Sequence, residues 1–254
     1  MDNIAKESFF QKYKVYIYIF CTTAVLIFFF ALYESGYRLT DDYTLGKVGR
    51  LEVALPLAGT SVFVDSSQKI TTTKDNETVF VFLSPKTHQI IVSKEGYFPW
   101  KKDVKVDSKK SVEIKPLVVP SNASGQIITS VDPDYWSIRN KIMIDPLPTL
   151  SSPKTSEDGS TKIWVDDNGI SAMVGSTTVS VLKTDSAIRN ISFYKNRNDA
   201  IIFSTVDGIF VIEIDNKGGQ NFMPIYKGVR PSFIEADPAF IYVLDGENLM
   251  QVIL

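Results

Sequence analysis

The longest apolar stretch of the chain lies near its N-terminus. The run from Val15 to Tyr33 contains no charged residue, no Pro and no Gly. With a rise of about 1.5 Å per residue, a helix over this run is roughly as long as the hydrocarbon core of a bilayer is thick. The pattern therefore predicts a transmembrane helix over 15–33, with the lipid bilayer as its partner.

A cleaved signal peptide and a lipid-attached cysteine are the two alternatives to a membrane anchor. A cleaved signal peptide has an apolar core of about 7 to 15 residues followed by small residues. Here the bulky Phe28, Phe29 and Phe30 stand close to the exit instead. Cys21 lies in the middle of the run and follows the bulky Phe20, so the sequence does not favour lipid attachment at this cysteine. We expect an uncleaved anchor.

Basic residues near the ends of the run predict its orientation. The loops that stay in the cytoplasm are rich in Lys and Arg. The bias favours a cytoplasmic 1–14 and an extracytoplasmic chain from Glu34 onward, although Lys47 and Arg50 reduce it. The opposite orientation would keep the rest of the chain inside the cell as a scaffold. The lysines before the run are Lys6, Lys12 and Lys14; Glu34, Arg38, Asp41 and Asp42 follow it.

A juxtamembrane linker is expected over 34–48, because this stretch shows no helical or strand period. Over 49–117 the apolar residues alternate with polar ones in short runs between turn residues, which is typical of an antiparallel sandwich of six or seven strands. The alternating residues are Leu51, Val53, Leu55, Val62, Val64, Val79, Val81, Leu83, Ile90, Val92, Val104, Val106, Val112 and Ile114.

Strand and turn residues over 49–117 form a recognisable succession: Gly49, Leu51, Val53, Pro56, Ala58, Gly59, Val62, Val64, Asp65, Leu83, His88, Ile90, Val92, Gly96, Tyr97 and Leu117. On these residues the stretch resembles the PEGA domain. The resemblance implies a small β-sandwich that bacterial and archaeal surface proteins carry as a module beside other domains, without a catalytic site. Three departures are visible: an extra residue between Pro56 and Val62, Ser66 where a Gly commonly follows the Asp, and Lys86-Thr87 in place of a Gly.

A Pro- and Ser-containing linker over 118–126 leads into a second region, 127–254. Here a strand–hairpin–strand unit recurs about every 38 to 40 residues. Its period and hairpins resemble propeller blades of the WD40-like kind. The three units are Ile163-Trp164-Val165 with Asn168-Gly169 and Ile170, Ile201-Ile202-Phe203 with Asp207-Gly208 and Ile209, and Ile241-Tyr242-Val243 with Asp245-Gly246 and Leu249.

Three such units are too few for a ring, because propellers have at least four blades. Four interpretations stay open. The 36 residues before Trp164 supply an atypical blade, the ring closes with another chain, the chain is the front part of a longer product, or the region is a second sandwich with evenly spaced hairpins. In each of them the fold is mainly β.

Composition narrows the setting. The formal charge of -2 with intermixed acidic and basic residues does not favour nucleic-acid binding. The only cysteine is Cys21, so the exported part folds without disulfides, which suits a bacterial or archaeal envelope. The densest basic stretch reads as the solvated face of a strand and its turn, with a surface for anionic lipid or cell-wall polymer as the alternative. Its residues are Lys101, Lys102, Lys105, Lys109 and Lys110.

Candidate catalytic residues are few. His88 is the only histidine and has no metal-ligand spacing around it, so we expect a turn or strand residue there. Tyr97, Phe98 and Trp100 are expected to plug the end of the sandwich. The acidic residues near turns are explained by turn chemistry and do not form a calcium loop. They are Asp132, Asp134, Asp166, Asp167 and Asp207. We predict no catalytic, cofactor or metal site.

These patterns predict a single-pass protein of the cytoplasmic membrane that acts as a non-catalytic structural or binding module of a cell envelope. Its partners would be a cell-surface polymer or an envelope protein. The alternative is a membrane-anchored glycan hydrolase, because paired carboxylates can be far apart in sequence. Two carboxylates within about 10 Å of each other in one cleft would favour that alternative.

Overall fold

A computed structural model describes residues 9–39, 45–167 and 169–254 of the chain. The expectations that concern Lys6, Asp41, Asp42 and Asn168 therefore fall outside the described residues. The described chain forms two compact units. The first holds Met1–Val53, Phe80–Thr87 and Lys105–Ile114, and the second holds Ala54–Val79, His88–Val104 and Lys115–Leu254.

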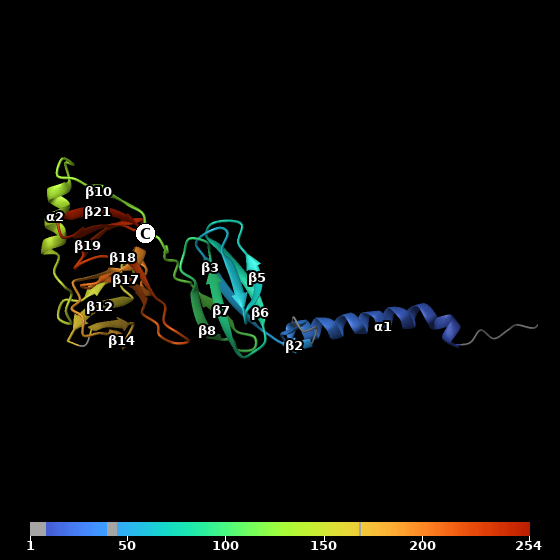
Figure 1. The fold of residues 1–254 in the computed structure, drawn as a ribbon. Coiled ribbons are helices and arrows are strands. Elements are labelled where there is room, and N and C mark those ends of the chain that lie inside the picture. The colour runs from blue at the N-terminus through green and yellow to red at the C-terminus, as the bar shows by residue number, and fades with distance from the viewer. Residues whose placement is uncertain (1–8, 40–44, 168) are drawn as a thin grey trace, which may run out of the picture. The chain divides into compact units, whose positions relative to one another are not determined.

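The predicted apolar helix is present as α1, Phe9–Glu34, the long blue helix of Figure 1. It begins six residues before the predicted Val15 and ends one residue after Tyr33. Its stretch Tyr13–Glu34 has a mean hydropathy of 2.4 and is long and apolar enough to cross a membrane. The side chains in this stretch are exposed, which in water would leave a large apolar surface uncovered.

The segment 34–48 differs from the predicted strand-free linker. Strand β1, Tyr37–Leu39, pairs antiparallel with β2, Leu45–Lys47. The chain leaves α1 through Gly36, whose φ is +82°, and the backbone N–H of Val48 donates to the Gly36 carbonyl over 3.1 Å. Strands of three residues are too short to produce a recognisable period-two pattern, which is why the sequence did not indicate them.

Seven strands follow, in agreement with the predicted six or seven. They form a three-stranded sheet of order β6-β3-β9 and a four-stranded sheet of order β5-β4-β7-β8. Buried and exposed side chains alternate along β3, β4 and β7, the pattern expected of sandwich strands. The strands are β3 (Gly49–Leu55), β4 (Ser61–Val64), β5 (Ser67–Thr71), β6 (Glu77–Leu83), β7 (Thr87–Ser93), β8 (Trp100–Lys105) and β9 (Ser111–Ile114).

One strand pair corrects the prediction of an antiparallel sandwich. Strands β3 and β9 run parallel, with Leu51 opposite Val112 and Val53 opposite Ile114. The chain moves from β8 in the four-stranded sheet to β9 in the other sheet, so β9 reaches the edge of β3 through a crossover instead of a hairpin. Alternation along a strand carries no information about the direction of its neighbour.

The expected linker 118–126 is extended but well attached within the second unit. Leu117 and Val119 are fully buried. The Phe98 N–H donates to the Val119 carbonyl and the Ser121 N–H to the Gly96 carbonyl, each over 2.9 Å. Strand β10 (Gly125–Ile128) already begins inside the predicted linker. Pro120, within this segment, suits an extended, edge-lying chain.

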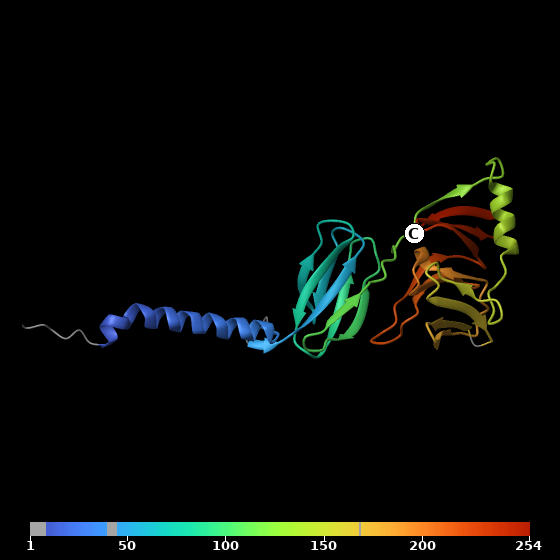
Figure 2. The same cartoon turned by 180° about the vertical axis from the view of Figure 1, so that it is seen from behind.

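The region after this segment contains three four-stranded antiparallel sheets, coloured yellow-green to red in Figures 1 and 2. Their orders are β11-β12-β13-β14, β15-β16-β17-β18 and β10-β21-β20-β19. The strands are β11 (Lys154–Thr155), β12 (Thr161–Asp166), β13 (Gly169–Val174), β14 (Thr177–Lys183), β15 (Asn190–Phe193), β16 (Ala200–Ser204), β17 (Gly208–Glu213), β18 (Phe222–Lys227), β19 (Ser232–Asp237), β20 (Phe240–Asp245) and β21 (Asn248–Ile253).

The three predicted hairpins each join one antiparallel pair. The pairs are β12 with β13, β16 with β17, and β20 with β21, in chain order. The third sheet takes its fourth strand from the start of the region, because β10 pairs with β21. Each described sheet is open, and no barrel closes among the described residues.

The core of the first two of these sheets explains their nearly continuous apolar runs. All five side chains of β16 and all four of β15 are buried, so both faces of these strands are covered. One cluster of buried residues spans the two sheets. It contains Ile163, Ile170, Ala172, Val181, Ile188, Ile191, Phe193, Ile201, Phe203, Ile212 and Ile214.

Candidate functional site

The acidic residues singled out in the sequence lie in turns or at strand ends and are not brought together. Asp132 accepts hydrogen bonds from the N–H and the hydroxyl of Thr129, over 2.6 and 3.0 Å. Asp134 precedes helix α2 (Tyr135–Ile144), and Asp166 at the end of β12 accepts from the Ser171 hydroxyl over 2.7 Å. None of these residues, nor Asp167 or Asp207, lines the pockets described below.

His88 is a buried strand residue in β7. It is 3% exposed, and its Nδ1 lies 2.8 Å from Oδ2 of Asp65. The other carboxylate oxygen of Asp65 accepts the N–H of Gln89 over 3.1 Å. The pair therefore holds the β4–β5 turn against β7, and within the described chain no group of three His, Cys, Asp or Glu side chains is placed to hold a metal ion.

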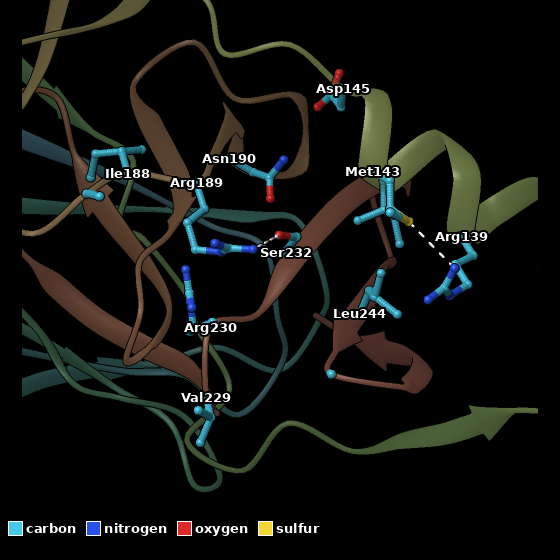
Figure 3. Close-up of a pocket in the computed structure, with 13 residues that line it drawn as sticks. Arg139, Met143, Asp145, Ile188, Arg189, Asn190, Val229, Arg230, Ser232 and Leu244 are labelled. Atoms are coloured by element: carbon cyan, nitrogen blue, oxygen red, sulfur yellow. Dashed lines mark hydrogen bonds between the residues drawn. The ribbon is translucent and has the colours of Figure 1, made fainter.

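A pocket of about 630 Å³ in the second unit is the most distinctive site (Figure 3). Its wall is formed by α2, by the connection from β14 to β15, by the connection from β18 to β19, and by the β20–β21 hairpin. This volume lies within the range of small-molecule sites, about 300 to 1,000 Å³. Arg139, Arg189 and Arg230 line it, together with the single carboxylate Asp145.

The arginines of this pocket carry uncompensated positive charge. Among the described residues, none of the three forms an ion pair with a carboxylate. Arg189 is held in place because its Nε donates to the Pro231 carbonyl over 3.2 Å and its Nη2 to the Ser232 hydroxyl over 3.0 Å. A guanidinium cannot lose its proton at physiological pH, so the pocket keeps its positive charge.

Asn190 adds a neutral donor to the same wall. Asn190 is buried, with 4% of its surface exposed, and its Oδ1 accepts a hydrogen bond from the N–H of Phe233 over 3.0 Å. The Ser204 hydroxyl also donates to Oδ1, over 3.4 Å. No acceptor in the described part of the chain bonds its Nδ2, so the amide group can donate to a bound molecule. Guanidinium and amide donors around one cavity are suited to an oxyanion.

A second pocket, of about 370 Å³, is acidic. Glu157, Glu235 and Asp237 line it. Burial raises the pKa of Glu235, while the hydrogen bonds from Ser192 and Lys195 oppose this shift. Both oxygens of Glu235 are already occupied: the Ser192 hydroxyl donates to Oε2 over 2.8 Å and the Lys195 N–H to Oε1 over 3.0 Å. The carboxylate thereby links β19 to β15 and to the segment that follows β15.

Sequence reasoning missed α2 and the arginine pocket. Only Ile142 is buried along α2, so the helix lacks the apolar stripe that marks an amphipathic helix. The three arginines come from different connections, separated by about 40 to 50 residues of chain. Their spacing was a signal, since Arg189 and Arg230 lie 12 and 11 residues before Ile201 and Ile241, where two predicted units begin.

Comparison with known proteins bears on the first β region. No curated protein matches the chain. The PEGA domain is a non-catalytic type of module and suggests an extracellular structural or binding role. The predicted stretch 49–117 begins and ends several residues before the stretch that matches this family. Residues 58–122 of this chain match the PEGA domain family.

Proposed function

We propose that this chain is a membrane-anchored structural and binding module of a bacterial or archaeal cell envelope. In this proposal α1 spans the cytoplasmic membrane with the N-terminus inside, and the chain from Glu34 onward lies outside. The PEGA-like strands act as a spacer. The three sheets after them form a propeller-like unit that presents its loops to a polymer or protein of the envelope.

The observation that carries the proposal is the order of two features along the chain. An exposed apolar helix, Tyr13–Glu34, precedes a stretch, 58–122, that matches a module type suggestive of extracellular proteins. A helix of this length and composition is stable in a bilayer, where its backbone groups are satisfied internally. The cysteine-free chain after it suits an envelope in which folding relies on apolar burial.

The proposed ligand of the binding unit is an anionic group of an envelope polymer. The charge of Arg139, Arg189 and Arg230 and the free amide of Asn190 support this choice. A carboxylate or phosphate can accept two parallel N–H donors from one guanidinium, so these side chains select for oxyanions over neutral sugars.

The topology is tested by adding protease to intact spheroplasts that express the full chain. We expect digestion of the part after Glu34, because the lysines that favour a cytoplasmic side precede the apolar run from Val15 to Tyr33. A tag placed before Met1 should survive as the internal control. Full protection of the part after Glu34, with digestion only after lysis, would contradict the proposal.

A glycan hydrolase is the second candidate, and one observation favours it: Glu157 and Glu235 line one pocket, and burial raises the pKa of Glu235. A raised pKa is a property of a general acid. Against it, both oxygens of Glu235 accept hydrogen bonds from the protein. The test is release of reducing ends from purified cell-wall glycan. We expect none; turnover that Glu235→Gln abolishes without unfolding the chain would establish the hydrolase.

A further inference from the structure

A pocket at the C-terminal end of α1 combines positive charge with exposed aromatic residues. It has a volume of about 340 Å³ and lies entirely within the first unit. Its lining includes Tyr33 and Glu34, the last two residues of α1, so the pocket lies within one turn of the helix end. In a membrane-spanning helix, this is the depth at which lipid headgroups begin.

Arg38 is held beside the helix end by contacts with two tyrosines. Its guanidinium carbon lies 3.5 Å from the centre of the Tyr33 ring. Its Nη1 donates to the carbonyls of Tyr33 and Tyr37 over 2.8 and 2.9 Å. Arginine and tyrosine are both typical of the membrane–water interface. There the apolar part of each side chain lies against the lipid and its polar end reaches the water.

Lys109 approaches the same point from the turn between β8 and β9. Its N–H donates to the Val48 carbonyl over 2.9 Å. Its side chain passes over Gly36, since a Cβ at Gly36 would lie only 2.9 Å from the Lys109 Cγ. The turn that positions Lys109 has a positive φ of +61° at this residue. Backbone strain of this kind costs roughly 1 kcal/mol. The Cε atom, which carries the ammonium group, would lie 3.3 Å from the same Cβ, so the charge is held beside the helix end.

The remaining charges of the junction are partly neutralised. Arg50 forms an ion pair with Glu52, and Lys110 lies 3.2 Å from Asp107. Glu34 is the only carboxylate among the residues that line the pocket. Arg38 and Lys109 have no carboxylate partner in the described part of the chain, so they provide its free positive charge.

Two phenylalanines extend this surface along β6. Phe80 and Phe82 are 53% and 54% exposed, and their spacing of two places them on the same face of the strand. Arg50 lies 5.3 Å from the Phe80 ring centre and Arg38 lies 5.9 Å from that of Phe82. Exposed aromatic rings interleaved with cations are poorly suited to water but well suited to the headgroup region of a membrane.

We propose that this junction binds the phosphate groups of anionic phospholipids in the membrane that α1 spans. Arg38 and Lys109 would hold the phosphate, while Phe80 and Phe82 enter the headgroup layer. The proposal rests on the proposed function in one respect, that α1 is a membrane-spanning helix. It assigns a ligand class to the juxtamembrane surface, and it does not depend on which side of the membrane the chain occupies.

The test uses the full chain in nanodiscs that contain a headgroup-attached spin label. One set holds zwitterionic phosphatidylcholine and the other a phosphatidylglycerol mixture. The readout is paramagnetic broadening of NMR signals from Phe80 and Phe82, which are unchanged in every variant. We compare the native chain with the double variant Arg38→Gln/Lys109→Gln. The control double variant, Lys183→Gln/Lys227→Gln, removes the same charge from exposed strand ends elsewhere.

Each cation near an anionic membrane contributes roughly a five-fold factor to association, so two contribute about 25-fold at low salt. We expect strong broadening only in phosphatidylglycerol, its loss in the Arg38→Gln/Lys109→Gln variant, and native behaviour in the control. Equal broadening in both lipids, or broadening unchanged by the double variant, would overturn this proposal alone. Failure of the chain to enter nanodiscs would overturn the membrane anchor and this proposal together.

Discussion

The indole Nε1 of Trp100 donates a 2.5 Å hydrogen bond to Oε1 of Glu213, and both residues are almost fully buried. The bond joins β8 to β17 within the second unit. The second oxygen of Glu213 accepts from the Asn221 side chain over 2.9 Å and lies 3.5 Å from Lys102 Nζ. A buried carboxylate is thus fully satisfied by residues that are far apart in sequence.

Replacing Trp100 by Phe should destabilise the chain, because it removes one donor from a buried charge. Hydrogen bonds to charged groups contribute about 1.5 to 3 kcal/mol, and we expect a loss of this size in the free energy of unfolding. Denaturant unfolding in detergent checks it. Trp136→Phe is the matched control, since Trp136 is 59% exposed and should change stability by less than about 0.5 kcal/mol.

The same pair allows a double-mutant cycle. If Trp100 and Glu213 interact directly, the combined Trp100→Phe/Glu213→Ala variant should lose less stability than the sum of the two single variants. Additive losses would mean that the 2.5 Å contact does not contribute to folding.

Elements with a local sequence signal could be predicted from the sequence, whereas contacts between residues far apart in the chain could not. The apolar run of α1 and the hairpins at Gly169, Gly208 and Gly246 are local signals, and their elements were predicted. The Trp100–Glu213 bond spans 113 residues, and the arginine pocket joins α2 to three other segments of the chain. Periodicity shows which face of a strand is buried but not which strand or loop lies opposite, so neither site could be predicted.

The turn between β4 and β5 should become more stable with glycine at position 66. Asp65 and Ser66 have φ angles of +49° and +69°, as a two-residue type I′ turn requires. A non-glycine residue in this conformation destabilises the fold by about 1 to 2 kcal/mol. Glycine avoids this strain but loses more conformational entropy on folding, so only part of the strain energy is gained as stability. We expect Ser66→Gly to raise the free energy of unfolding by roughly 0.5 to 1 kcal/mol.

The neighbouring Ser67 is the control for that prediction. It lies in β5, where glycine weakens a strand by about 0.5 to 1 kcal/mol. Thermal unfolding of Ser66→Gly and Ser67→Gly should therefore shift in opposite directions. A lower unfolding temperature for both variants would show that the serine side chain at position 66 contributes more than its backbone strain costs.

Gly169 should tolerate no side chain. Its φ is +130°, and a Cβ there would lie 2.2 Å from the Leu182 carbonyl oxygen, on the neighbouring strand. Gly175, in the next turn, has a φ of +59° with no atom within 4 Å of such a Cβ. We expect Gly175→Ala to cost about 1 kcal/mol and Gly169→Ala clearly more, because β14 must move. Equal losses in denaturant unfolding would contradict the close approach.

Glu235 should make the stability depend on pH in the acidic range. Burial raises its pKa above the ordinary value of 4.5, and the nearby Glu157 acts in the same direction, whereas Lys154 lowers it. The folded chain therefore binds more protons than the unfolded chain between 4.5 and the folded pKa. In this window the free energy of unfolding falls as pH rises.

Glu235→Gln removes this titration, so its stability curve should be flatter than that of the native chain above pH 4.5. Denaturant unfolding between pH 4 and pH 8 gives both curves. The control is Glu247→Gln, which changes an exposed carboxylate of the β20–β21 hairpin. Parallel curves for Glu235→Gln and the native chain would show that Glu235 has the same pKa in both states.

The arginine pocket should bind oxyanions in proportion to its charge. Arg139→Gln/Arg230→Gln removes two cations that make no ion pair in the described chain, and leaves Arg189 with its structural bonds to Pro231 and Ser232. Hydrogen bonds to charged groups contribute about 1.5 to 3 kcal/mol, so losing one to each arginine should weaken binding at least 100-fold.

Calorimetry with glucuronate and glycerol phosphate, with the full-length chain held in detergent, measures this loss of affinity. Glucose is the neutral comparison and Lys183→Gln/Lys227→Gln the charge-matched variant. Binding of glucose as strong as that of glucuronate, or equal loss in both variants, would show that the pocket does not recognise an anion.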